Sequence, residues 1–178
     1  MAIITLGANA ITALPSGVGG KVLQTVSTTK TDTFATNPSS AWIDVTGLSV
    51  SITPSAASSK ILILVDAKIS NNTGNSQHVH LRRNASDEIY RGDASGNKTR
   101  ASSSAYVHAT IAATGYYGVI PISLTYLDSP NTTSATTYKL SHSSGEALQF
   151  CINQSFEDDD IASRVRTASS ITAIEIGV

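Results

Sequence analysis

The stretch from Leu48 to Ile69 constrains the fold of this chain more than any other segment. From position 48 to position 53, apolar residues alternate with serine and threonine, and this period of two predicts a strand with one buried face. Pro54 ends that strand, because proline has no backbone N–H to donate within a sheet. The apolar run Ile61–Val65 is too continuous for a half-solvated strand, so it predicts a buried central strand. We therefore expect the two segments to form a hairpin-like unit of an all-β domain.

Strand signals continue along the rest of the chain, whereas the sequence contains no helical pattern and no internal repeat. They recur about every 8 to 14 residues with turn residues between them, which is typical of β-sandwiches. We predict an antiparallel β-sandwich, jelly-roll-like, with a short N-terminal arm. Besides the opening pair, the expected strands are a long edge strand over 22–34 and strands at 42–45, 78–82, 89–90, 106–111, 118–126, 136–140, 147–152 and 171–176.

The first 20 residues differ from the rest of the chain. Their apolar residues are separated by polar residues, glycine and proline, and positions 16–20 form a glycine-rich joint. Such a segment is either a first strand of the sandwich with a loose connection or an arm that docks on another subunit. We expect an arm, which divides the chain into an anchoring segment, 1–20, and a sandwich domain, 21–178. The residues predicted to anchor the arm are Ile3, Ile4, Leu6, Ile11 and Leu14.

Length and charge limit the classes of partner. With 178 residues, the chain is long enough for one domain with a substantial core. The net charge is -1 and charged residues make up 14% of the sequence, so no basic surface is expected to attract nucleic acid or an anionic membrane. No apolar segment is long enough to span a bilayer and no secretion signal is visible, so we expect synthesis in a cytoplasm without membrane insertion. The single cysteine, Cys151, is predicted to be a small buried apolar residue.

Few residues point to chemistry. The glycines before Lys21 resemble a phosphate-binding loop, but the positions required for its first glycine and its final hydroxyl hold Pro15 and Val22. No nucleophile motif is present, so we expect neither enzymatic activity nor a cofactor. His78 and His80 lie on one face of a predicted strand and are weak candidates for a shared metal site, since no third ligand is identifiable. The acidic run 157–160 lacks the ligand spacing of calcium loops, and we interpret it as a solvated loop.

Aromatic residues offer a different kind of site. Tyrosine has an apolar ring face and a hydroxyl group, so a cluster of tyrosines can form a platform for sugars, but we favour packing in the core or in an interface. The candidate receptor contacts of such a platform are Tyr116 and Tyr117, within a cluster that also holds Tyr106 and Tyr126. The tripeptide Arg91-Gly92-Asp93 matches an adhesion motif, but we interpret it as ordinary turn chemistry.

Four stretches together resemble a family of small structural proteins of tailed bacteriophages: Gly20–Phe34, Asp44–Pro54, Gly92–Ser103 and Leu127–Pro130. The family is common in marine and cyanobacterial phages, and its members are labelled tail fibre, head fibre or virion structural protein. The resemblance spans roughly residues 20 to 178. It implies a β-sandwich that assembles as a trimer on the particle surface, and it carries no catalytic residues across.

Sequence and resemblance together predict a non-enzymatic virion structural protein that is made in the host cytoplasm and located in the virion. The expected form is a short homotrimeric fibre, attached to the tail or baseplate through its N-terminal arm, with loops 92–104 and 157–166 displayed outward. Its expected partners are itself, other virion proteins and a host surface glycan. The first alternative is a capsid decoration protein that contacts the major capsid protein. The second is a carbohydrate-binding host-receptor module.

Overall fold

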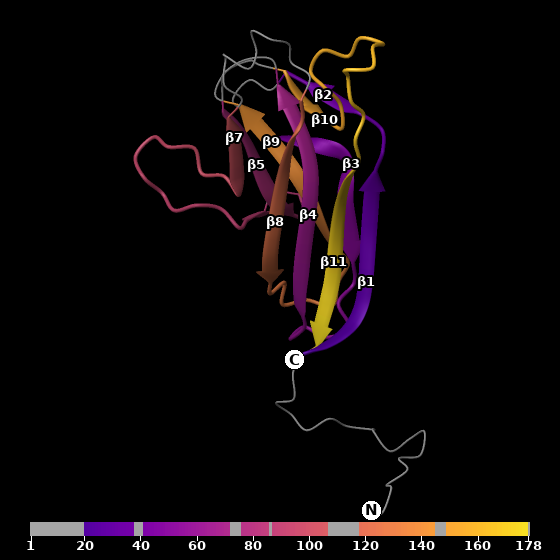
Figure 1. Ribbon diagram of the computed structural model, residues 1–178. Helices are drawn as coiled ribbons and strands as arrows, with labels where there is room; N and C mark the ends of the chain where they lie inside the picture. Colours follow the sequence, from indigo (N-terminus) through magenta and orange to yellow (C-terminus); the bar gives the residue numbers. More distant parts are fainter. Residues whose placement is uncertain are drawn as a thin grey trace, which may run out of the picture.

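The computed structural model describes residues 20–37, 41–71, 76–85, 87–106, 118–144 and 149–177 of the chain (Figure 1). Within these residues there are eleven strands and no helix. All strand pairs are antiparallel, and the strands form two sheets that pack face to face. The predicted antiparallel β-sandwich is confirmed.

Each sheet draws strands from both halves of the chain. Sheet A consists of β1 (Lys21–Lys30), β2 (Phe34–Thr36), β4 (Lys60–Asn71), β8 (Ile120–Asp128), β10 (Phe150–Ile152) and β11 (Ser169–Gly177). Sheet B consists of β3 (Ile43–Ile52), β5 (Ser76–Arg83), β6 (Asp87–Ile89), β7 (Ser103–Tyr106) and β9 (Thr136–Ser144).

The strands that span the two sheets lie in the order β1-β11-β4-β8 in sheet A and β3-β9-β5-β7 in sheet B, and the short strands β10 and β2 extend sheet A beside β4 while β6 pairs with β5. Strands that follow one another along the chain mostly lie in opposite sheets, and the first strand, β1, pairs with the last, β11. This interleaving of two Greek keys is the arrangement of a jelly roll, as predicted. A consequence is that the chain enters and leaves the sandwich at the same end (Figure 1).

The predicted hairpin between residues 48–53 and 61–69 is wrong. β3 pairs with β9 in sheet B, whereas β4 pairs with β8, β10 and β11 in sheet A. Residues 53–59 therefore cross from one sheet to the other. The apolar sides of β3 and β4 are nevertheless buried in one common core. The two strands lie in different sheets, and the inward faces of the two sheets pack against each other.

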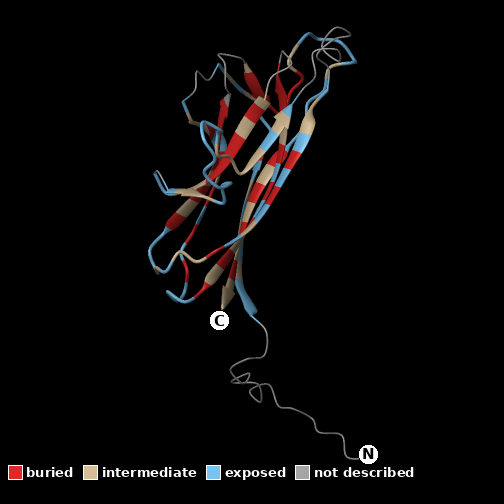
Figure 2. Ribbon diagram, turned by 90° about the vertical axis from the view of Figure 1, so that its left-hand side faces the viewer, coloured by how far each residue is buried: buried red, intermediate tan, exposed pale blue. Residues whose placement is uncertain are grey.

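Burial alternates along most strands, with one side facing the core (Figure 2). In β4, Ile61, Ile63 and Val65 are buried, but Leu62 is half-buried and Leu64 is 37% exposed. The prediction that the run 61–65 forms a central strand is confirmed, and the prediction that it is buried throughout is wrong. The largest fully buried side chains are Tyr138, Phe150, Leu48, Ile61, Ile63, Ile69, Leu81, Leu140, Ile152, Ile171, His80 and His142.

The N-terminal part of the chain is described only from residue 20, and its first strand is shorter than predicted. The expected long strand over 22–34 stops at Lys30, and β2 pairs with β10 at the far end of sheet A. Residues 1–19 lie outside the described residues, and so do the predicted anchoring residues. The division into an arm and a sandwich therefore stays a prediction for Ile3, Ile4, Leu6, Ile11 and Leu14.

Candidate interaction surfaces

The outer face of sheet A is rich in apolar side chains. Strand register places Val22 opposite Ile176, and it places Leu62 between Ile174 and Leu127. Val22 is 60% exposed and Leu127 is 51% exposed. Scattered apolar residues are normal on a protein surface, but a contiguous group across neighbouring strands marks a contact site. This surface, the apolar face, consists of Val22, Leu62, Leu64, Leu127, Ile174 and Ile176.

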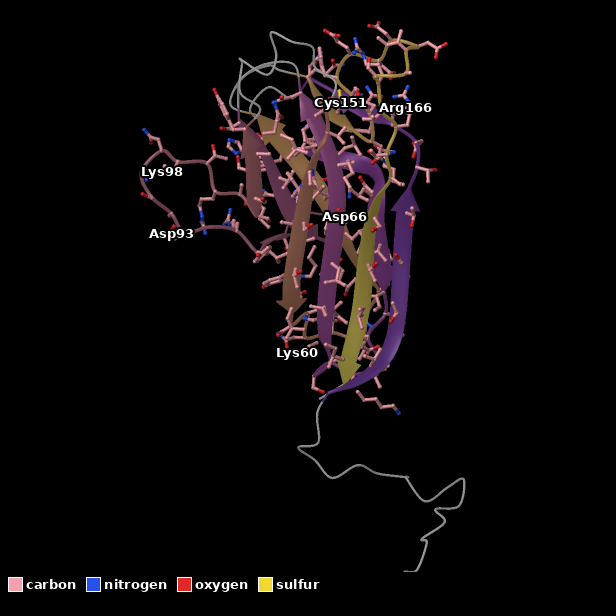
Figure 3. The ribbon with its side chains drawn as sticks, viewed as in Figure 1. Lys60, Asp66, Asp93, Lys98, Cys151 and Arg166 are labelled. Atoms are coloured by element: carbon pink, nitrogen blue, oxygen red, sulfur yellow. The ribbon has the colours of Figure 1, made fainter. Side chains whose placement is uncertain are left out.

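The polarity of this outer side changes along the strands. Leu64 lies between Thr172 and Thr125, and one step further along the same side Asp66 lies between two serines. The apolar residues therefore gather at the end of β4 that carries Lys60, and Asp66 lies further along the strand (Figure 3). A solvated sheet would show hydroxyl or charged residues along its whole length.

The chain enters the sandwich beside the apolar face. A Cβ atom on Gly20 would overlap with Cγ2 of Ile176, so the backbone at Gly20 passes directly against this side chain. Glycine is favoured at this close approach because a larger residue would force Ile176 or the backbone to shift. Residues 1–19 are thus attached at the apolar end of sheet A.

The outermost strands of sheet A have open edges within the described residues. β1 pairs there only with β11, and the long strand β8 pairs only with β4. Pro121 removes one donor from β8, which is a common protection of an edge strand. β1 has no proline, so the backbone groups on the side away from β11 offer donors and acceptors to a further strand.

The second surface feature is a groove beneath the loop that joins β6 to β7. The loop closes at its neck, where Gly92 N donates to Ala101 O at 3.1 Å and Arg100 Nε donates to Gly92 O at 2.7 Å. The labelled residues Asp93 and Lys98 lie on the projecting part of the loop (Figure 3). The groove, which we call the loop groove, measures about 510 Å³ and is lined by His78, Gly92, Asp93, Ser95, Lys98, Thr99, Arg100, Ala101, Ser103 and Ser104.

His78 and His80 lie on one face of β5 but in different environments. His78 Nδ1 is 3.1 Å from Ser104 Oγ at the floor of the loop groove. His80 is buried, stacks on Trp42 with ring centroids 3.4 Å apart, and places Nε2 against the carbonyl oxygen of Arg100. Burial lowers the pKa of both imidazoles. In the described part of the chain, no group of three ligating side chains that could hold a metal ion is found.

The acidic loop is internally paired. Arg164 contacts Glu157 at 2.6 Å and Asp159 at 3.1 Å, and Arg166 contacts Asp158 at 2.6 Å. Four carboxylates and two guanidinium groups leave the segment 157–166 with a charge of -2 (-4 + 2). These ion pairs account for the acidic run as part of a folded loop.

The remaining candidates divide between described and undescribed residues. Cys151 is buried in β10, as predicted, and burial raises the pKa of its thiol. Tyr126 stacks on Tyr90 with ring centroids 5.0 Å apart, and Tyr106 is 54% exposed at the end of β7. Tyr116 and Tyr117, the predicted receptor contacts, lie outside the described residues.

Sequence reasoning missed both surfaces. The signal for the apolar face was present in the run 61–65, since Leu62 and Leu64 exceed what one buried face requires. The loop groove had a weaker signal, because the charged residues of the segment 92–104 were interpreted only as turn chemistry. Nothing in the linear sequence places His78 opposite Ser104, which is a matter of strand register.

No family model and no curated protein matches this chain. Similar solved structures include one of the Gx strain of infectious bursal disease virus, at 12% identity and a TM-score of 0.35, and one of the VP2 subviral particle of that virus, at 12% identity and a TM-score of 0.28. Each alignment covers 87% of this chain and 40% of the other, so the chain spans less than half the length of these proteins. Such low scores identify neither a family nor a function. Among the described residues, no helix has the length and hydropathy to cross a membrane.

Proposed function

We propose that this chain is a non-enzymatic structural component of a virus particle that associates with copies of itself through the apolar face. The single observation that carries the proposal is the gathering of exposed and half-buried apolar side chains at one end of sheet A, beside the point where the chain enters. Water contact with such a surface is unfavourable by about 25 cal/mol per Å² of apolar area, which favours its coverage by a partner.

The fold supports a role in a particle without defining it. Jelly rolls occur in viral capsid proteins and in lectins, and a fold alone does not establish a function. The resemblance to small structural proteins of tailed bacteriophages favours the particle. A closed symmetric assembly of identical chains would also cover the open edges of sheet A.

The form we propose is a short homotrimeric fibre attached to the tail or baseplate through residues 1–20. The segment 1–19 joins the sandwich beside the apolar face, so it can leave the trimer at the end where the copies meet. Loops such as 92–104 lie away from that end, where they face outward (Figure 1). A capsid decoration protein is the first alternative, and a carbohydrate-binding receptor module is the second.

Copy number in purified particles tests the role directly. Quantitative mass spectrometry of intact particles should find a small number of copies for a tail fibre. Hundreds of copies would favour the decoration protein instead, and absence from the particles would contradict a structural role. We also expect no depolymerisation when the chain is incubated with host surface polysaccharide; chain shortening would contradict the non-enzymatic assignment.

Deletion of residues 1–16 tests the anchoring segment. We expect the truncated chain to stay folded and oligomeric, because all described strands lie C-terminal to the deletion. It should nevertheless fail to enter particles when it competes with the full chain during assembly. The measurements are light scattering of the purified protein and mass spectrometry of the particles. Aggregation of the truncated chain would show that the segment is a strand of the sandwich.

A further inference from the structure

We propose that the loop groove binds an acidic sugar of a surface polysaccharide, a hexuronic acid or a related residue that carries a carboxylate. Its volume of about 510 Å³ lies within the range of roughly 300–1,000 Å³ that small-ligand sites occupy. This inference rests on the proposed function in one respect: a protein on the exterior of a virus particle would meet the polysaccharide of a host surface. Binding by the isolated chain does not depend on particle assembly.

The groove is held by hydrogen bonds at its base. Ser102 N donates to Val79 O at 2.8 Å, and Leu81 N donates to Ser102 Oγ at 2.9 Å, so the returning arm of the loop is fixed to β5. At the tip, Lys98 N donates to Ser95 O at 3.1 Å. A loop fixed at its neck, base and tip loses little conformational entropy when a ligand binds.

The charges in the groove favour an anion. Among the described residues, Lys98 and Asp93 make no side-chain hydrogen bond or ion pair, and the Arg100 side chain donates only through Nε, to Gly92 O. Two cations and one carboxylate leave a charge of +1 in the groove (+2 - 1), although the whole chain carries -1. A carboxylate on the ligand would therefore meet Lys98 and the outer nitrogens of Arg100.

The other lining groups favour a sugar over a simple anion. The carboxylate of Asp93, which is unpaired within the described part of the chain, can accept hydrogen bonds from neighbouring sugar hydroxyls, which an anion without hydroxyl groups does not offer. Ser104 lies opposite His78, and Tyr106 follows on the same face of β7, two residues further along. The half-exposed ring of Tyr106 thus offers an apolar surface beside the polar groove, as sugar rings require.

Three trimeric probes of similar size test separately whether the groove recognises the carboxylate and whether it recognises the sugar ring. Titration calorimetry and NMR of the full chain should detect binding of trigalacturonate, and they should detect at least tenfold weaker binding of neutral galactotriose. Triglutamate carries the same number of side-chain carboxylates without a sugar ring, and we also expect it to bind at least tenfold more weakly. Added salt should weaken trigalacturonate binding, because the contacts are exposed ion pairs.

Variants locate the site. Lys98→Gln and Asp93→Asn should each weaken trigalacturonate binding roughly tenfold, as expected for the loss of one charge-assisted hydrogen bond. Tyr106→Ala should weaken it about threefold to tenfold, as expected for the loss of one ring contact. Lys21→Gln and Asp160→Asn make the same charge changes at exposed positions outside the groove and should leave binding unchanged. Thermal unfolding of each variant checks that the fold is retained.

Three results would overturn the inference: no binding of trigalacturonate at millimolar concentration, equal binding of triglutamate, or equal losses in the groove variants and the two control variants. Equal binding of triglutamate would indicate a surface that recognises acidic peptides. Failure of the structural role would look different, because the chain would then be missing from particles while sugar binding by the isolated protein persisted.

Discussion

His142 is the residue with the sharpest expected effect on stability. It is fully buried in β9, stacks on Phe150 with ring centroids 3.9 Å apart, and meets the edge of Phe34. Neither ring nitrogen has a hydrogen-bond partner among the described residues. Burial lowers the pKa of this imidazole to about 4, from an ordinary value of 6.5.

This pKa shift makes stability depend on pH. Below pH 6.5 the unfolded chain binds a proton at this histidine, whereas the folded chain stays neutral there until about pH 4. The free energy of unfolding should therefore fall as the pH falls from 6.5 to 4. His142→Phe removes the titrating group and keeps a ring in the stack, so it should reduce the loss between pH 7 and pH 4.5 by about 2 kcal/mol. Urea unfolding at the two pH values measures it, and equal losses in both proteins would contradict the assignment.

At the scale of the elements, a buried cluster joins the two sheets. Asp128 ends β8 in sheet A and accepts hydrogen bonds from two residues of sheet B, Tyr138 Oη at 2.7 Å and Arg83 at 3.0 Å. Asp128 is almost fully buried, and burial together with the bond to Asp128 raises the pKa of the Tyr138 phenol. The carboxylate therefore holds the β8 edge of sheet A to the middle of sheet B.

Removal of this carboxylate should be costly. Asp128→Ala leaves the Tyr138 hydroxyl and part of the Arg83 guanidinium without a partner, so we expect a loss of about 3–5 kcal/mol in the free energy of unfolding. Tyr138→Phe removes one hydrogen bond and should cost only about 0.5–1.5 kcal/mol. Urea unfolding of the two variants side by side gives the comparison. Similar losses would show that Asp128 does not join the sheets in this way.

The strands themselves were predictable, but their pairing was not. The period of two in residues 48–53 and 171–176 identifies β3 and β11, because it follows from how each strand buries one face. The partners of β3 and β4 depend on which sheet each strand joins, and alternation is the same in either sheet. The predicted hairpin failed for this reason, although the fold class was right.

The candidate surfaces were predictable only in part. Leu62 and Leu64 were visible in the sequence as apolar residues beyond those that one buried face requires. The sequence pattern of such a run is the same whether the second face of the strand packs within its own chain or against a separate subunit. The loop groove depends on the register that sets His78 opposite Ser104 and on backbone bonds at Gly92. Neither has a local signal in the sequence.

At the scale of the whole molecule, one end of the jelly roll is apolar and carries the entering chain, while the projecting loop 90–102 lies away from that end (Figure 1). This polarity suits a protein that meets its own copies at one end and its surroundings elsewhere. The surface proposed for self-association and the surface proposed for sugar binding are separate, because the apolar face lies on sheet A and the loop groove lies on sheet B. Variants of one surface should therefore leave the other intact.

The most direct test of self-association is the mass of the full chain in solution, measured by light scattering with small-angle X-ray scattering. We predict a compact trimer, three times the 18.5 kDa of the chain. Leu127→Lys should yield a folded monomer, because it places a charge within the apolar face. Ser123→Lys places the same charge further along the same side of β8 and should stay trimeric. A full chain that stays monomeric, or a Leu127→Lys variant that stays trimeric, would contradict association through the apolar face.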